Sequence, residues 1–235
     1  IEVRGRGITI KGFTVTGGRR GISVLWGGQA VIDGNTVQQS GGIWVRFGSS
    51  AAIRNNTVQN SRSHGIALTD NSVARILNNT VKNSRLNGIL VVQNSSAWVG
   101  VLSLGDKTPR PNILENNGTY GLLVGRSSAA RIVGNTMSNN KRDGIAVIRG
   151  SAAHISSNTI DANGRDGIAV NRNSHVSMKS ARTKIFRASN ITTSNNSGFG
   201  ISCTRNSDVD GFLGSLIGNK GKKNFAPSCV DRMKP

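Results

Sequence analysis

Short apolar stretches separated by turn-forming residues run along nearly the whole chain. In one representative segment, Ile145–Val147 is followed by Ala153–Ile155 and then by Asn158–Ile160. Residues alternate within each stretch with the period of a β-strand, and no stretch is long enough for a helix. The pattern predicts an all-β protein built from units of three short strands.

A glycine precedes the first strand of each unit, in the pattern Gly-Ile/Leu-x-Val/Leu. The marked glycines are Gly21, Gly42, Gly65, Gly88, Gly121, Gly144, Gly167 and Gly200, with Cys203 replacing the valine in the last copy. Their intervals are 21, 23, 23, 33, 23, 23 and 33 residues, so two units carry about ten additional residues. A three-strand unit cannot bury its own inner face, and therefore the units must stack. We expect a single-domain solenoid of about nine coils, with ~23 residues per coil.

The domain boundaries follow from the same spacing. We expect residues 1–20 to form an incomplete first coil whose N-terminal cap is missing, residues 21–210 to form the coils, and residues 211–235 to form a last partial coil and tail. The additional residues predict insertions near 100–111 and 178–188. Both are basic and begin at the same corner of their coils, where a rigid scaffold could present them to a ligand.

The repeated Gly-Ile-x-Val strand and the Asn-Thr-Val/Met/Ile segment before the next glycine resemble the right-handed parallel β-helix repeat proteins of the pectate-lyase-like superfold. The resemblance covers roughly residues 7–205. It implies a right-handed parallel β-helix and a tendency towards polysaccharide lyases, hydrolases and uronate epimerases, alongside non-catalytic relatives. The paired-Asp and Gly-His-Gly motifs of polygalacturonases, the Asp-Pro-His of alginate epimerases and the Arg-x-Pro-x-x-Arg of pectate lyases are missing. The resemblance therefore implies the fold and a tendency towards such substrates, and it does not assign catalytic residues to this chain.

Stacking converts equivalent positions into columns of side chains, and two columns are typical of structural corners. One is formed by Asn35, Asn56, Asn79, Asn135 and Asn158, with Asn112 expected to join them. The other is formed by Ser49, Ser72, Ser95, Ser128, Ser151, Ser174 and Ser207. Asparagine can bond its own backbone and its neighbours' amides at a tight corner. No serine in the second column has a paired histidine that would indicate a nucleophile.

The formal net charge of +19 predicts attraction to polyanions and says nothing about the fold. Five residues after each signature glycine, one column reads Trp26, Phe47, Asp70, Gln93, Arg126, Arg149, Arg172 and Arg205. Four stacked arginines repel one another unless counter-charges or a ligand intervene. Because guanidinium groups match carboxylate or sulfate, the column predicts a ligand site; the alternative is a set of solvated turn residues.

A second basic border lies at the other end of the same strand. Its members are Arg62, Arg85, Lys141, Arg142 and Arg165. Together the borders predict a basic groove beside the first parallel sheet. The candidate substrate-binding residues are Arg126, Arg149, Arg172, Arg205, Arg142, Arg165 and Lys141.

Candidates for catalysis occupy the position just before the signature glycine: His64, Tyr120, Asp143 and Asp166. Strand spacing would bring the carboxyl groups of Asp143 and Asp166 to about 5 Å, similar to a retaining glycosidase pair. The alternative is that Arg142 and Arg165 neutralise them. In an enzyme acting by β-elimination or C5 epimerisation of a uronate, basic-column arginines would bind the carboxylate, and Tyr120 or His64 would transfer the proton.

Other functions remain open on the sequence. The outer face of the first strand is mostly small or apolar, apart from Trp44 and Arg46, so it could stack sugars or join another subunit. Nucleic acid is less favoured because aromatic residues make up only 4%. We therefore predict binding of an anionic, uronate-type polysaccharide with or without turnover, and a binding, adhesive or oligomerising module as the alternative.

The remaining expectations concern cysteines, metals and location. A bridge between Cys203 and Cys229 would close 26 residues and contribute about 3 kcal/mol, and two buried thiols are the alternative. The sequence has no metal-ligand spacing and predicts no cofactor. No stretch is apolar for long enough to span a bilayer. We expect a secreted, periplasmic or cell-surface protein.

Overall fold

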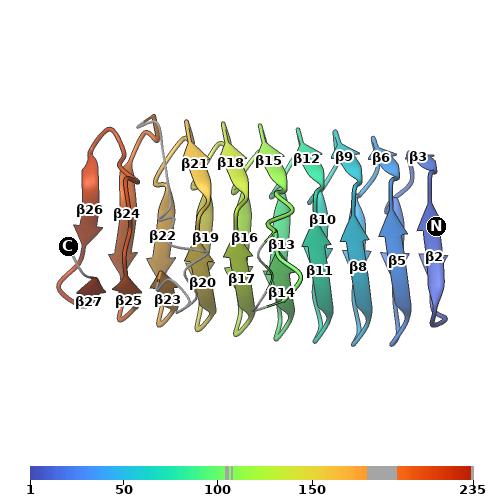
Figure 1. Ribbon diagram of the computed structural model, residues 1–235, viewed down its shortest axis with the longest axis horizontal. Helices are drawn as coiled ribbons and strands as arrows, with labels where there is room; N and C mark the ends of the chain where they lie inside the picture. Colours follow the sequence, from blue (N-terminus) through green and yellow to red (C-terminus); the bar gives the residue numbers. More distant parts are fainter. Residues whose placement is uncertain (104–105, 107, 179–194, 234–235) are drawn as a thin grey trace.

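The protein is a stack of about nine parallel coils (Figure 1). The computed structural model describes residues 1–103, 106, 108–178 and 195–233. Each complete coil contributes one strand to each of three sheets, called A, B and C in the order in which the chain visits them. The described residues contain no helix, and hence none that is long and apolar enough to cross a membrane.

Sheet A contains the strands that follow the signature glycines. Its members are β1 (Glu2–Val3), β4 (Ile22–Val24), β7 (Ile43–Val45), β10 (Ile66–Leu68), β13 (Ile89–Val92), β16 (Leu122–Gly125), β19 (Ile145–Ile148), β22 (Ile168–Asn171), β24 (Phe199–Thr204) and β26 (Gly221–Phe225). The first and third signature positions face the interior. Ile145 and Val147, for example, are completely buried.

Sheet B also has ten strands, and sheet C has seven within the described residues. The strands of sheet B are β2 (Ile8–Lys11), β5 (Gln29–Asp33), β8 (Ser50–Arg54), β11 (Val73–Leu77), β14 (Ser96–Val99), β17 (Ala129–Val133), β20 (Ala152–Ser156), β23 (His175–Met178), β25 (Asp208–Gly211) and β27 (Val230–Met233). Those of sheet C are β3 (Thr14–Thr16), β6 (Thr36–Gln38), β9 (Thr57–Gln59), β12 (Thr80–Lys82), β15 (Ile113–Glu115), β18 (Thr136–Ser138) and β21 (Thr159–Asp161).

Equivalent residues of successive coils pair directly, which confirms the repeat predicted from the glycine spacing. Ile145 is registered with Ile168 in sheet A, and Ala153 with Val176 in sheet B. All these pairs are parallel, so each position stands about 4.8 Å from its equivalent in the next coil. The inner faces of the three sheets enclose one continuous apolar core.

Two asparagine ladders hold the corners of the coils. At the corner between sheets B and C, Asn79 donates to Asn112 Oδ1 at 2.9 Å, so Asn112 does belong to the expected column. A second ladder, which the sequence analysis missed, lies at the corner between sheets C and A. Its members are Asn117, Asn140, Asn163 and Asn196. These side chains satisfy buried backbone groups that a sharp corner would otherwise leave unpaired.

The signature glycines are required by close approach of neighbouring coils. A Cβ atom on Gly144 would lie 2.9 Å from the carbonyl oxygen of Gly167 and closer still to a methyl group of Ile160. Only Gly42 among the eight signature glycines has a positive φ, 82°. A side chain at a signature glycine would therefore push two neighbouring coils apart.

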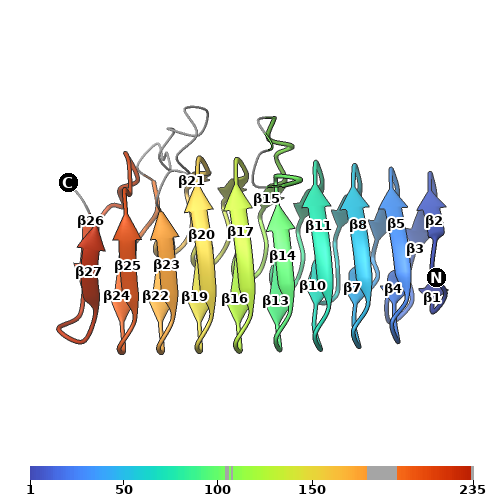
Figure 2. The same cartoon turned by 60° about the horizontal axis from the view of Figure 1, so that its bottom comes forward.

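The first insertion leaves the solenoid after β14, beyond the arrowhead of that strand (Figure 2). Its described part is held by Asp106, which accepts hydrogen bonds from the backbone of Leu102 at 2.8 Å and from Arg110 at 2.8 Å. The insertion expected near 178–188 lies, beyond Met178, outside the described residues.

The C-terminal residues extend the solenoid. β26 and β27 add one strand each to sheets A and B. Cys203 on β24 and Cys229 before β27 form a disulfide, so of the two alternatives left open by the sequence the structure has the bridge. Cys203 is completely buried in the core.

Candidate functional site

The basic column follows the ends of the sheet A strands, at the corner that leads to sheet B. Arg126, Arg149, Arg172 and Arg205 all adopt the left-handed conformation there, with φ of 55°, 59°, 60° and 55°. All four side chains are exposed. An L-residue other than glycine costs about 1–2 kcal/mol in this conformation, and asparagine tolerates it better than arginine. Trp26, Phe47, Asp70 and Gln93 adopt the same conformation at this position, so the corner geometry does not itself select arginine.

These four arginines have no ion pair within the described part of the chain. Arg46, nearer the N-terminus, behaves differently. It pairs with Asp70 at 3.2 Å, and its guanidinium lies over the rings of Trp44 and Phe47 at 5.6 and 4.5 Å. Arg46 is already neutralised, whereas the column that begins at Arg126 is free to meet an anion.

A hollow of about 410 Å³ lies on the outer face of sheet A, between strands β7 and β19. Its floor consists of outward-facing apolar residues: Trp44, Leu90, Val92, Leu123 and Ile148. Arg126 and Arg149 stand at the sheet B side, and His64 and Asn87 stand at the sheet C side. The hollow extends over four coil spacings, or about 19 Å.

His64 contributes a hydrogen-bond donor to this hollow. Its Nδ1 accepts a hydrogen bond of 3.3 Å from the backbone N–H of Asn87, and its ring lies edge-on to Trp44 at 5.9 Å. Burial lowers the pKa of His64 to about 4, so the ring is neutral near pH 7. Because Nδ1 is the acceptor, the proton of the neutral ring is on Nε2.

The other predicted residues do not line the hollow. Tyr120 lies at the corner between sheets C and A, where its hydroxyl accepts a hydrogen bond of 3.3 Å from Arg142. That hydrogen bond raises the pKa of Arg142. Lys141 and Arg165 are exposed at the same corner. Arg172 and Arg205 continue the basic column beyond the hollow, towards the C-terminus.

Asp143 and Asp166 belong to a backbone-capping column. Asp143 Oδ1 accepts a hydrogen bond of 2.9 Å from the N–H of Asp166, and Asp166 Oδ1 accepts one of 2.7 Å from the N–H of Phe199. Asp143 is buried, and burial together with the charge of Asp166 raises its pKa to about 6 against the opposing hydrogen bond and Arg165. The structure thus brings the two carboxyls together in a corner and away from the hollow.

One group of residues was missed entirely by the sequence analysis. Trp98, Arg131, His154 and His175 gather on the outer face of sheet B. The available signal was the column of Trp98, Arg131 and His154 at one outward position of the second strand, which was not followed. His175 stands two residues earlier on its strand, in the neighbouring outward column.

The fold and its columns can be compared with known proteins. The sequence profile of the right handed beta helix region matches residues 1–103 and 101–222. The chain belongs to this family. No curated protein sequence matches it.

Two solved structures are similar to this β-helix protein. The periplasmic alginate epimerase AlgG has a TM-score of 0.56 and 20% identity, covering 93% of this chain and 49% of that one. The A-module of the mannuronan C-5 epimerase AlgE6 of Azotobacter vinelandii has a TM-score of 0.35 and 12% identity, covering 97% of this chain and 80% of that one. The chain therefore spans about half the length of the AlgG chain, and the likeness concerns the fold.

Proposed function

We propose that the hollow on sheet A binds an anionic polysaccharide of the uronate type. The observation that carries the proposal is the placement of two exposed arginines without ion pairs, Arg126 and Arg149, at the edge of an apolar-floored groove. The net charge of +19 would attract such a polymer over long distances, and the arginines would fix its register.

Each part of the groove matches a part of a polyuronate. Carboxylates accept the paired N–H groups of Arg126 and Arg149. The apolar faces of the sugar rings cover Leu90, Val92 and Leu123, whose burial excludes water from the ion pairs. His64 donates from Nε2 to a hydroxyl or ring oxygen. Arg172 and Arg205 extend the same edge for a longer chain.

Alginate is the first polymer to test because one protein of similar fold is an alginate epimerase. Retention of the protein on immobilised alginate should fall when Arg126→Ala and Arg149→Ala are combined. The matched control combines Arg6→Ala with Arg75→Ala, two exposed arginines away from sheet A, and removes the same charge. Equal losses in both variants would show that net charge alone causes retention, and an unchanged Arg126/Arg149 variant would remove the groove from the proposal.

A catalytic role is the second candidate, favoured by the presence of an imidazole and guanidinium groups in one hollow. β-Elimination or C5 epimerisation would require a base for the C5 proton, and His64 could serve only after its Nδ1 released the Asn87 N–H. Unsaturated uronate in the product would reveal elimination, and exchange of the C5 proton with deuterated solvent would reveal epimerisation. His64→Gln should abolish either signal while retention persists. Retention without either signal supports a binding protein.

The apolar floor could alternatively join two copies of the chain. Mass measurement in solution separates this from the ligand interpretation, because a monomer leaves the floor available to a sugar polymer. A dimer that dissociates when alginate is added would still support the groove.

A further inference from the structure

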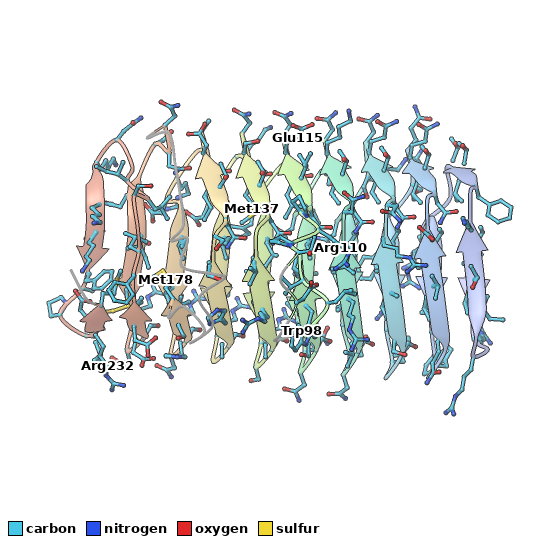
Figure 3. All side chains as sticks on the ribbon, viewed as in Figure 1. Trp98, Arg110, Glu115, Met137, Met178 and Arg232 are labelled. Atoms are coloured by element: carbon cyan, nitrogen blue, oxygen red, sulfur yellow. A yellow bond between two sulfur atoms is a disulfide. The ribbon has the colours of Figure 1, made fainter. Side chains whose placement is uncertain are left out.

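The outer face of sheet B carries a column of functional side chains in successive coils. Register places Trp98 beside Arg131, Arg131 beside His154, and His154 beside Ser177, with Asp210 next. Trp98 is labelled on β14 in Figure 3. None of these residues belongs to the sheet A groove, because the two sheets form different faces of the solenoid.

A second hollow, of about 380 Å³, lies over this column. Trp98, Arg131, His154 and His175 line it, with small residues such as Ala152 beneath. It is a shallow depression that is open to solvent on its outer side.

Arg131 lacks a partner for its charge. Its guanidinium lies over the ring of Trp98 at 5.9 Å, and its Nε is buried without a hydrogen bond. No ion pair within the described residues involves Arg131. Burial lowers its pKa. A half-buried guanidinium without a counter-charge is unfavourable, and an anion bound beside it would relieve that cost.

His154 supplies an unpartnered imidazole at the next coil. Its Nε2 is buried and has no hydrogen bond. Burial, followed by the charge of Arg131, lowers the pKa of His154 to about 4 against the opposing effect of Asp210. His154 and Arg131 are registered on adjacent strands, whose backbones are about 4.8 Å apart.

A second, oriented imidazole borders the same hollow. His175 Nδ1 lies 2.9 Å from Asp208 Oδ1, and Asp208 is also 3.8 Å from Arg232, labelled on β27 in Figure 3. The acidic groups Asp208 and Asp210 limit the charge that the hollow can accept. Asp208 already contacts His175 and Arg232, and Asp210 stands three coils from Arg131 in the same column. One guanidinium beside a neutral imidazole, with these carboxylates further along the sheet, suits a single negative charge better than a phosphate or sulfate dianion.

We propose that this hollow is a second binding site, for a small hydroxy-carboxylate such as a single uronic acid unit or an open-chain sugar acid. The carboxylate pairs with Arg131, and a neighbouring hydroxyl bonds the imidazole of His154. The site is independent of the proposed polymer groove on sheet A, and either can exist without the other.

The three histidines of the chain report on the two sites separately, because His64 lies in the sheet A hollow and His154 and His175 lie in the sheet B hollow. We suggest following their ring Cε1–Hε1 resonances by NMR while adding sodium glucuronate, sodium gluconate, sodium acetate or neutral glucose. We expect the resonances of His154 and His175 to shift with glucuronate or gluconate while that of His64 stays unchanged. The acid that binds with the higher affinity shows whether the site prefers a sugar ring or an open chain. Shifts confined to His64, or equal shifts with acetate or glucose, would overturn the proposal.

Substitutions test the two contacts. Arg131→Met should weaken the affinity at least tenfold, Arg131→Lys should weaken it less, and His154→Leu should weaken it about tenfold. Arg6→Met provides the matched loss of one exposed charge and should leave the affinity unchanged. If Arg131→Met unfolds, the Arg131→Lys variant decides. Unchanged affinity in the folded Arg131 and His154 variants would exclude this hollow, whatever happens on sheet A.

Discussion

The carboxylate of Asp143 accepts a hydrogen bond of 2.9 Å from the backbone N–H of Asp166, one coil further along the solenoid. This contact explains why two acidic residues occur at stacked positions: they cap backbone N–H groups. Asn87 occupies the equivalent position two coils earlier, and its Oδ1 lies 3.4 Å from the N–H of Tyr120. The amide can therefore perform the same structural role without a charge.

Replacing Asp143 by asparagine should stabilise the protein above pH 6. The folded pKa of Asp143, about 6, exceeds the ordinary value of 3.8, so the folded state binds more protons than the unfolded state between these pH values. Stability from this group is consequently lost as the pH rises from about 4 to 6. The loss is on the order of 3 kcal/mol, and Asp143→Asn should recover part of it above pH 6 because the amide keeps an acceptor oxygen without the charge.

The measurement is the free energy of unfolding in urea at pH 4 and pH 8, for the parent and the variant. Subtracting the two proteins removes the contributions of His64 and His154, which titrate in the same range. A variant that is less stable than the parent at pH 8 would show that the charge of Asp143 is needed.

The second asparagine ladder should be essential for stability. Asn140 donates to Leu114 O and Asn163 Oδ1, each at 3.0 Å, and accepts from Asn117. Asn140→Ala leaves these buried groups unpaired and should cost about 3 kcal/mol or more. The adjacent Asn139 is exposed with φ of 54°, so Asn139→Gly should change stability by less than about 0.5 kcal/mol. Equal costs in urea unfolding would contradict the ladder's role.

Reduction of the disulfide should destabilise the C-terminal end of the solenoid. The bond between Cys203 and Cys229 closes a separation of 26 residues, and its loss should lower the free energy of unfolding by about 3 kcal/mol. Urea unfolding with and without a reducing agent measures this. The double variant Cys203→Ala with Cys229→Ala should match the reduced protein and be insensitive to the reducing agent.

Substitutions in the basic column should weaken binding to alginate without lowering the stability of the fold. Combining Arg126→Gly with Arg149→Gly removes two left-handed arginines, φ 55° and 59°, and should leave stability unchanged or raise it by about 1 kcal/mol. The same variant should lose its retention on alginate. Urea unfolding and retention, measured on one preparation, test both outcomes. A large loss of stability would mean that these arginines have a structural role.

The groove illustrates how far the sequence could predict the site. Arg126, Arg149 and His64 were identified from their columns, and the structure brings them to one hollow. Tyr120 occupies the same column as His64, yet its hydroxyl contacts Arg142 and does not line the hollow. The two residues differ in the partners that neighbouring coils bring to them, which are Asn87 and Trp44 for His64 and Arg142 for Tyr120. Spacing along the chain does not specify these contacts.

The sequence by itself determined the repeat, the inward residues and the corner columns, because a strand period of two and a fixed unit length leave only one way to bury the apolar face. Only the tertiary structure decided which columns share a hollow. It also placed Arg131 beside His154 on adjacent strands, although the two residues are 23 positions apart in the chain. It also showed Asp143 to be a backbone cap. These relationships depend on distances between coils, which local patterns do not encode.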